Sequence, residues 1–190
     1  MWLDGLDVPL VSFLRAGFRE GHEARAQALQ RTEGETAARF GAGMLPLEHD
    51  RQGSLTSPVF SYPYERSRQA LHVLSRAGHV DPHLGLCLKY VNPLNGDWAM
   101  PTLGTSLRYF PRGFQTRAYR STESLVLVGM EGRADIVLQD GTVLAIGAND
   151  VVAIPGWTSW SVHAHDDAVF FAYSDRPVHE KLGLLREQRS

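Results

Sequence analysis

The sequence is short of the features on which several common classes of protein depend. Its single cysteine, Cys87, excludes a disulfide framework within the chain and a zinc site built from cysteine pairs. No uninterrupted apolar run of 18 residues is present, so we expect no helix that crosses a membrane. The 19 basic and 21 acidic residues give a net charge of −2, and no basic surface for nucleic acid is predicted. Because residues 1–7 contain no basic region followed by an apolar run, we expect no signal peptide and a cytoplasmic protein.

Motifs for nucleophilic catalysis and phosphate binding are also missing. No serine or cysteine lies in a nucleophile elbow, and no glycine-rich loop suits a phosphate. His72, His79 and His83 lie near Cys87, but their spacing matches no pattern of metal ligands. We interpret these three histidines as surface and loop residues.

The length and the composition favour one domain with an appendage, or at most two small domains. The chain has 190 residues, of which 43% are hydrophobic, enough to bury a core. Residues 19–60 are polar and rich in glycine, which predicts a long extended connection between domains or onto a neighbouring subunit. We therefore divide the chain into an inter-domain segment, 1–85, and a β domain, 86–190.

Three helices are predicted, of which the clearest spans 64–77. There Ala70, Leu71, Leu74 and Ala77 recur at helical spacing, and Gly78 ends the pattern. Shorter helices are predicted at 8–18 and 178–187. The apolar residues at the start of the chain, Trp2, Leu3 and Leu6, are expected to pack on something that precedes them or on a partner.

From residue 86 onward the pattern changes to short strands. Asp140-Gly141 is a strong signal for a hairpin turn between two of these strands. The spacing is typical of an all-β barrel or sandwich. We predict strands at 87–91, 102–110, 118–129, 134–138, 142–146, 151–154, 160–164 and 168–174.

The glycines and a proline in residues 113–160 have the spacing of the two cupin motifs. Between Gly113 and Gly132, the positions of the cupin metal ligands hold Tyr119, Ser121 and Leu125. In the second motif Pro155 is present, but Trp160 replaces the histidine. Since a phenol, a hydroxyl, an alkyl group and an indole do not make a divalent-metal site, we predict that these four side chains point into the barrel and bind no metal.

Two further groups of side chains could carry chemistry. Arg117 and Glu123 share the face of Tyr119 if the strand has no bulge, so they could form a charged pair inside the barrel or lie at its mouth. His163 and His165 precede Asp166-Asp167 and superficially suggest a metal site. If Trp160 points inward, however, alternation turns both histidines outward, and we interpret the stretch as a solvated turn.

Taken in order, several stretches resemble the C-terminal half of gentisate 1,2-dioxygenase and its salicylate and 1-hydroxy-2-naphthoate relatives. The resemblance covers nearly the whole chain and is more specific than either cupin motif. The matching stretches occupy residues 2–11, 44–46, 57–64, 90–93, 99–102, 119–122, 174–178 and 182–184.

The resemblance implies a cupin fold, a double-stranded β-helix or jelly-roll barrel, and a bicupin enzyme. In such enzymes an N-terminal cupin holds Fe(II) on three histidines and opens the ring of gentisate with O₂ to give maleylpyruvate. No residue of this chain matches those histidines, so we expect no cofactor here, Fe(II) in the other cupin, and no activity of the chain alone. The implied partners are an iron-bearing cupin, a homo-oligomer, or both. The alternative is a stand-alone, metal-free cupin that serves as a binding or scaffold module.

Overall fold

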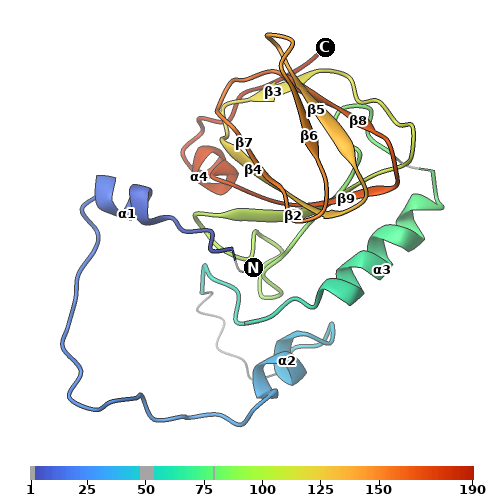
Figure 1. Cartoon of the computed structure of the whole chain (residues 1–190). Helices are drawn as coiled ribbons and strands as arrows, with labels where there is room; N and C mark the ends of the chain where they lie inside the picture. Colours follow the sequence, from blue (N-terminus) through green and yellow to red (C-terminus); the bar gives the residue numbers. More distant parts are fainter. Residues whose placement is uncertain (1–2, 48–53, 79) are drawn as a thin grey trace.

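The computed structural model describes residues 3–47, 54–78 and 80–190 (Figure 1). Four helices lie outside a β-barrel: α1 (Val8–Phe13), α2 (Glu35–Phe40), α3 (Tyr64–Ser75) and α4 (Arg176–Lys181). The strands are β1 (Leu86–Lys89), β2 (Gly104–Phe110), β3 (Tyr119–Ser121), β4 (Leu125–Glu131), β5 (Ala134–Leu138), β6 (Val143–Ile146), β7 (Val151–Ile154), β8 (Trp160–Ala164), β9 (Ala168–Ser174) and β10 (Glu187–Arg189).

The strands form two five-stranded antiparallel sheets that face each other. One sheet has the order β1-β2-β9-β4-β7 and the other the order β10-β3-β8-β5-β6. Figure 1 shows the two sheets wrapping around a common interior. The all-β cupin fold predicted from the sequence is confirmed.

Alternation along the strands builds the core between the sheets. On β8, Trp160, Val162 and Ala164 are buried, while Ser161 and His163 face outward and are half-buried. Phe110 and Phe170, from β2 and β9, add large side chains to the same cluster. Burial of these apolar faces is the main force that closes the barrel.

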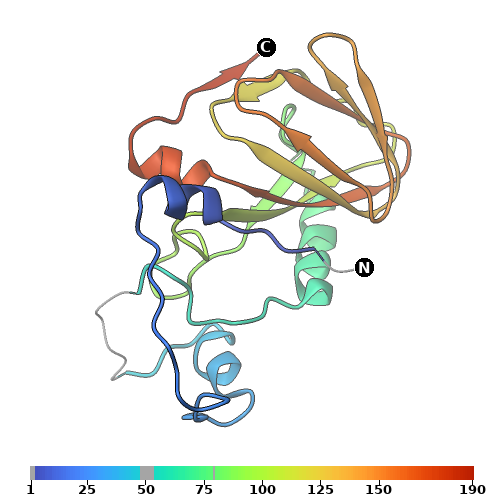
Figure 2. The same ribbon diagram turned by 60° about the vertical axis from the view of Figure 1, so that its left-hand side comes forward.

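Helix α3 covers the outer face of one sheet (Figure 2). Its fully buried Leu71 packs against Leu86 of β1, Leu107 of β2 and Val169 of β9. The predicted end of the helix is confirmed to within two residues, since α3 ends at Ser75 and Gly78 has a φ of +76°. This helix therefore shares a second, smaller core with the barrel.

The chain before α3 lies largely apart from the barrel. In Figure 1 it runs as an extended arch through α1 and α2, and Phe18 and Leu29 are almost fully exposed. Helix α1 is shorter than predicted, because Arg15 adopts a φ of +53° that a helix does not continue. Trp2 lies outside the described residues, and Leu3 lies in neither a helix nor a strand.

Three other elements differ from the sequence prediction. The short helix α2 was not predicted. The single strand expected at 118–129 is divided into β3 and β4, with the buried Glu123 between them. The last predicted helix ends early, and the residues after α4 form β10, which pairs with β3. No helix in the described part of the chain has the length and apolar character that a membrane crossing requires.

Candidate functional site

The four positions of the cupin ligands lie buried in the barrel interior. Tyr119 on β3 is the register partner of Trp160 on β8, and the two rings meet edge to face with centroids 6.2 Å apart and planes at 87°. Ser121 and Leu125 are buried beside them, at the ends of β3 and β4. An aromatic pair thus fills the space in which cupin motifs converge.

A polar network ties this interior to the C-terminal residues. The hydroxyl of Tyr119 donates to Glu187 Oε1 at 2.5 Å, and Ser121 donates to Glu123 Oε1 at 3.1 Å. Arg176 Nη1 donates to both carboxylates, at 3.3 Å to Glu123 and 3.0 Å to Glu187. The guanidinium compensates the charge of Glu123, which is only 5% exposed.

The network shifts the protonation of its members. Burial, together with the hydrogen bond to Glu187 and the charge of Glu123, raises the pKa of Tyr119 to about 12. Burial alone would raise the pKa of Glu187, but hydrogen bonds from Tyr119 and Arg176 outweigh it and hold this pKa below its usual value. The phenol is therefore neutral and the carboxylate charged near neutral pH.

Arg176, and not Arg117, is the partner of Glu123. The sequence suggested the pair Arg117–Glu123 on the condition that the strand has no bulge, and the structure places Arg117 in solvent. Alternation fails here because Thr116 and Tyr119, three residues apart, are both buried. The backbone N–H of Arg117 donates to Pro82 O at 2.7 Å.

A buried arginine that the sequence analysis missed lies in the same interior. Arg108 on β2 is 6% exposed, and its guanidinium carbon lies 5.7 Å from the centroid of the Trp160 ring. Within the described residues its Nε and Nη1 atoms have no hydrogen-bond partner. The alternation of Ser106, Arg108 and Phe110 on one face of the strand was the available signal.

The residues at these positions do not fit a divalent iron site. The pKa of about 12 disfavours a phenolate at Tyr119, and the indole nitrogen of Trp160 only donates. Leu125 offers no ligand atom. The two nearby carboxylates are already held, Glu123 by Ser121 and Arg176 and Glu187 by Tyr119 and Arg176.

The described histidines singled out in the sequence differ in their surroundings. His72 is exposed on α3, as predicted, and its Nε2 lies 3.0 Å from Arg76 Nη2. His83 lies in the loop before β1, as predicted, but it is buried there, with its Nδ1 3.1 Å from Ala118 O. His79 lies outside the described residues, and Cys87 is exposed.

His163 and His165 lie on the outside of the barrel, in agreement with the alternation argument. Asp135, which no spacing in the sequence relates to these histidines, joins them in the structure. Asp135 on β5 is the register partner of His163, and its Oδ2 lies 2.8 Å from His165 Nε2. Only the pairing of β5 with β8 brings this carboxylate, 28 residues before His163, into the group.

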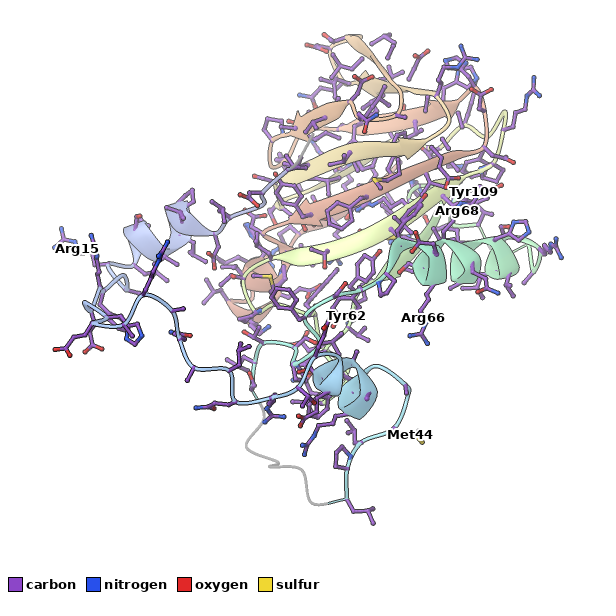
Figure 3. All side chains as sticks on the ribbon, turned by 60° about the horizontal axis from the view of Figure 1, so that its bottom comes forward. Arg15, Met44, Tyr62, Arg66, Arg68 and Tyr109 are labelled. Carbon is purple, nitrogen blue, oxygen red and sulfur yellow. The ribbon has the colours of Figure 1, made fainter. Side chains whose placement is uncertain are left out.

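An apolar groove of about 510 Å³ lies on the outer face of the other sheet. Tyr62, Tyr90 and Phe171 line it, and the Tyr62 hydroxyl donates to Val91 O at 2.6 Å. Figure 3 shows Tyr62 below this sheet, and Arg68 of α3 directed toward Tyr109 of β2. The groove offers aromatic surface outside the barrel interior.

Comparison with known proteins relates the whole chain to dioxygenases, although no protein-family model matches it. It is 42% identical over 190 residues to gentisate 1,2-dioxygenase 1 of Aquipseudomonas alcaligenes, a match that covers 100% of this chain and 54% of that protein. It is 32% identical over 196 residues to 5-aminosalicylate 1,2-dioxygenase of a Comamonas species, covering 99% of this chain and 50% of that one.

Solved structures agree with this relationship. Salicylate 1,2-dioxygenase from Pseudoaminobacter salicylatoxidans, as a variant in complex with gentisate, superposes with a TM-score of 0.84 at 25% identity over 97% of this chain and 52% of that one. The adduct of the same enzyme with gentisate gives 0.84 at 26% identity, with coverage of 97% and 52%. The chain spans about half the length of the curated relatives it matches. The resemblance found in the sequence is confirmed, and the chain is a cupin homologue of the gentisate and salicylate 1,2-dioxygenases.

Proposed function

We propose that this chain is the C-terminal cupin half of a ring-cleaving dioxygenase, and that it assembles with an iron-bearing cupin. The observation that carries the proposal is the closed barrel interior. There the Tyr119–Trp160 pair stands at two of the cupin ligand positions, and Arg176 holds Glu123 and Glu187 beside it. A barrel whose interior is filled in this way is suited to the structural support of a partner cupin and to assembly with it.

The chemistry of the reaction belongs to the other half in this proposal. O₂ reacts slowly with an aromatic ring unless a metal or cofactor passes electrons between them, and Fe(II) in a second cupin supplies that function. The substrate class is an aromatic ring with a carboxylate beside a hydroxyl, as in the gentisate and salicylate of the relatives' names.

Exposed apolar side chains at the start of the described chain offer a surface for the partner cupin. Leu3 and Leu6 are 48% and 65% exposed. Asp7 accepts a hydrogen bond of 2.6 Å from Thr102, so this segment is held beside the barrel. Exposed apolar side chains of this kind are candidates for partner binding.

Reconstitution tests the proposal. The chain should be mixed with the half of the A. alcaligenes gentisate 1,2-dioxygenase that it does not match, and O₂ uptake with gentisate and Fe(II) measured. We expect turnover by the mixture and none above free iron by the chain alone. Leu6→Glu should weaken assembly, whereas Leu29→Glu, at an almost fully exposed residue of the extended segment between α1 and α2, should not.

Turnover by the purified chain alone would contradict the proposal if changes in the barrel interior abolished it. The alternative is a stand-alone binding module, which the aromatic groove at Tyr62, Tyr90 and Phe171 favours. Under that alternative the chain would bind an aromatic acid such as gentisate without the partner, and Phe171→Ala would weaken this binding.

A further inference from the structure

We infer that Asp135, His163 and His165 form a binding site for a divalent transition-metal ion on the outside of the barrel. The site lies on the outer face of β5 and β8, strands that run side by side in Figure 1. It uses none of the interior positions of the cupin motifs. It also goes beyond the proposed function, because a role in assembly does not require it.

The backbone fixes the three side chains on one surface. His163 and His165 are two residues apart and therefore project to the same side. The register places Asp135 opposite His163, and His165 N donates to Arg133 O at 2.9 Å. On its other side His163 forms an isolated backbone bridge to Gln115, so the first histidine lies between β5 and this loop residue.

The possible ligand atoms of the three residues lie close enough together to bind one ion. One ligand atom from each residue can be chosen so that all lie within 4.8 Å of one another, and His165 Nε2 is 2.8 Å from Asp135 Oδ2. The two imidazole rings have centroids 4.8 Å apart. Since zinc binds imidazole nitrogen and carboxylate oxygen at about 2.0–2.2 Å, small rotations of these side chains would bring all three within reach of one ion.

The chemistry of the three ligands selects the class of ion. Two imidazoles favour zinc, nickel, cobalt or copper over calcium and magnesium, which prefer oxygen. One carboxylate adds negative charge and, as a third ligand, leaves positions for water, as in open zinc sites. Asp135 and His163 are half-buried and His165 is exposed, so an ion can enter from solvent.

The surrounding charges do not oppose a cation. Arg133, which lines the same surface depression as Asp135 and His165, donates from Nε to Asp166 Oδ2 at 2.8 Å, so its charge is paired. A surface depression of about 400 Å³ adjoins Asp135 and His165 and contains a further carboxylate, Asp150. Asp150 accepts a hydrogen bond from Gly147 N at 2.8 Å. The depression leaves room for water molecules on the open positions of the ion.

Metal titration of the full chain without a histidine tag tests the site. Zinc chloride should bind with one-to-one stoichiometry in calorimetry, and cobalt(II) should give the visible absorption of a site with nitrogen and oxygen ligands. His163→Gln, His165→Gln and Asp135→Asn should each weaken zinc binding at least about tenfold. The matched control His22→Gln/His72→Gln removes two exposed histidines and should leave the affinity unchanged.

Two results would overturn the inference. The first is the absence of one-to-one zinc binding by the native chain. The second is binding that the double variant His163→Gln/His165→Gln retains while it folds normally by circular dichroism. Because interior residues and the partner cupin take no part in this experiment, failure here would leave the proposed assembly role standing, and failed reconstitution would leave the metal site standing.

Discussion

Arg68 Nε donates a hydrogen bond of 2.8 Å to Glu131 Oε2, an ion pair that joins α3 to the end of β4. The other carboxylate oxygen accepts a bond of 2.5 Å from the Tyr64 hydroxyl. Burial alone would raise the pKa of Glu131, but the bonds from Tyr64 and Arg68 outweigh it and lower this pKa. One carboxylate thus holds two residues of the helix against the barrel.

We expect Glu131→Gln to lower the free energy of unfolding by about 1 kcal/mol at about pH 7, since the pair is partly solvated. The lowered pKa of Glu131 stabilises the fold above the pKa of the unfolded chain, about 4.3, and this contribution is lost as the pH falls through the folded value. Urea unfolding at pH 7 and at about pH 3 should therefore show a difference between variant and native chain that shrinks in acid. The exposed Glu65→Gln is the control, and an equal loss there would refute a specific role for Glu131.

Arg176→Met should be strongly destabilising, by about 3 kcal/mol or more, because it leaves the buried carboxylate of Glu123 without its cation. Arg117→Met removes an equal charge from an exposed position and should change the free energy of unfolding by less than about 0.5 kcal/mol. Thermal and urea unfolding of both variants provide the measurement. The reverse order of effects would mean that Arg117 supports Glu123 after all.

Tyr119→Phe should remove the hydrogen bond to Glu187 and cost about 1 kcal/mol. The pKa of Tyr119 is raised to about 12 in the folded chain. The neutral phenol therefore stabilises the fold fully below the pKa of the unfolded chain, about 10, and this stabilisation is lost as the pH rises through the folded pKa. Tyr64 and Tyr109 also have raised pKa values, so ultraviolet titration of tyrosinate should be compared between the native chain and the variant, and the variant should lack a step near pH 12. If Tyr173→Phe removed that step instead, the assignment would fail.

Limited trypsin digestion should first cut the segment that contains Arg19, Arg25 and Arg31, which lies in neither a helix nor a strand. Helix α3 should stay with the barrel because Leu71 is fully buried. Mass spectrometry of the earliest fragments identifies the first cleavage sites. First cuts within residues 86–174, or protection of residues 1–60 in the monomer, would show that the early segment is part of the packed unit.

The sequence was most informative where structure depends on near neighbours. The hairpin at Asp140-Gly141 is present, with Gly141 at a φ of +84°, and the strands 134–138, 151–154, 160–164 and 168–174 have the predicted bounds. Turn chemistry and period-two alternation are local properties, and they are strong in this part of the chain.

The sequence failed to predict elements and contacts that depend on residues distant from one another in the chain. β10 is a strand because it pairs with the edge of β3, where Ser121, the register partner of Glu187, lies 66 residues earlier in the chain. Arg176 reaches Glu123 because α4 packs beside the gap between β3 and β4, and Asp135 meets the two histidines only through the sheet register. Neither relationship leaves a periodic signal in the sequence.

The pairing of β10 with β3 also bears on how copies of the chain can associate. Three residue pairs between β10 and β3 cover the edge of β3, and the side-chain hydrogen bond between Tyr119 and Glu187 strengthens this pairing. A chain shortened before residue 187 would present an open strand edge, which another polypeptide can extend by backbone hydrogen bonds. The same strand supplied by a second copy would restore the edge, so this short terminal segment is a natural place for strand exchange between molecules.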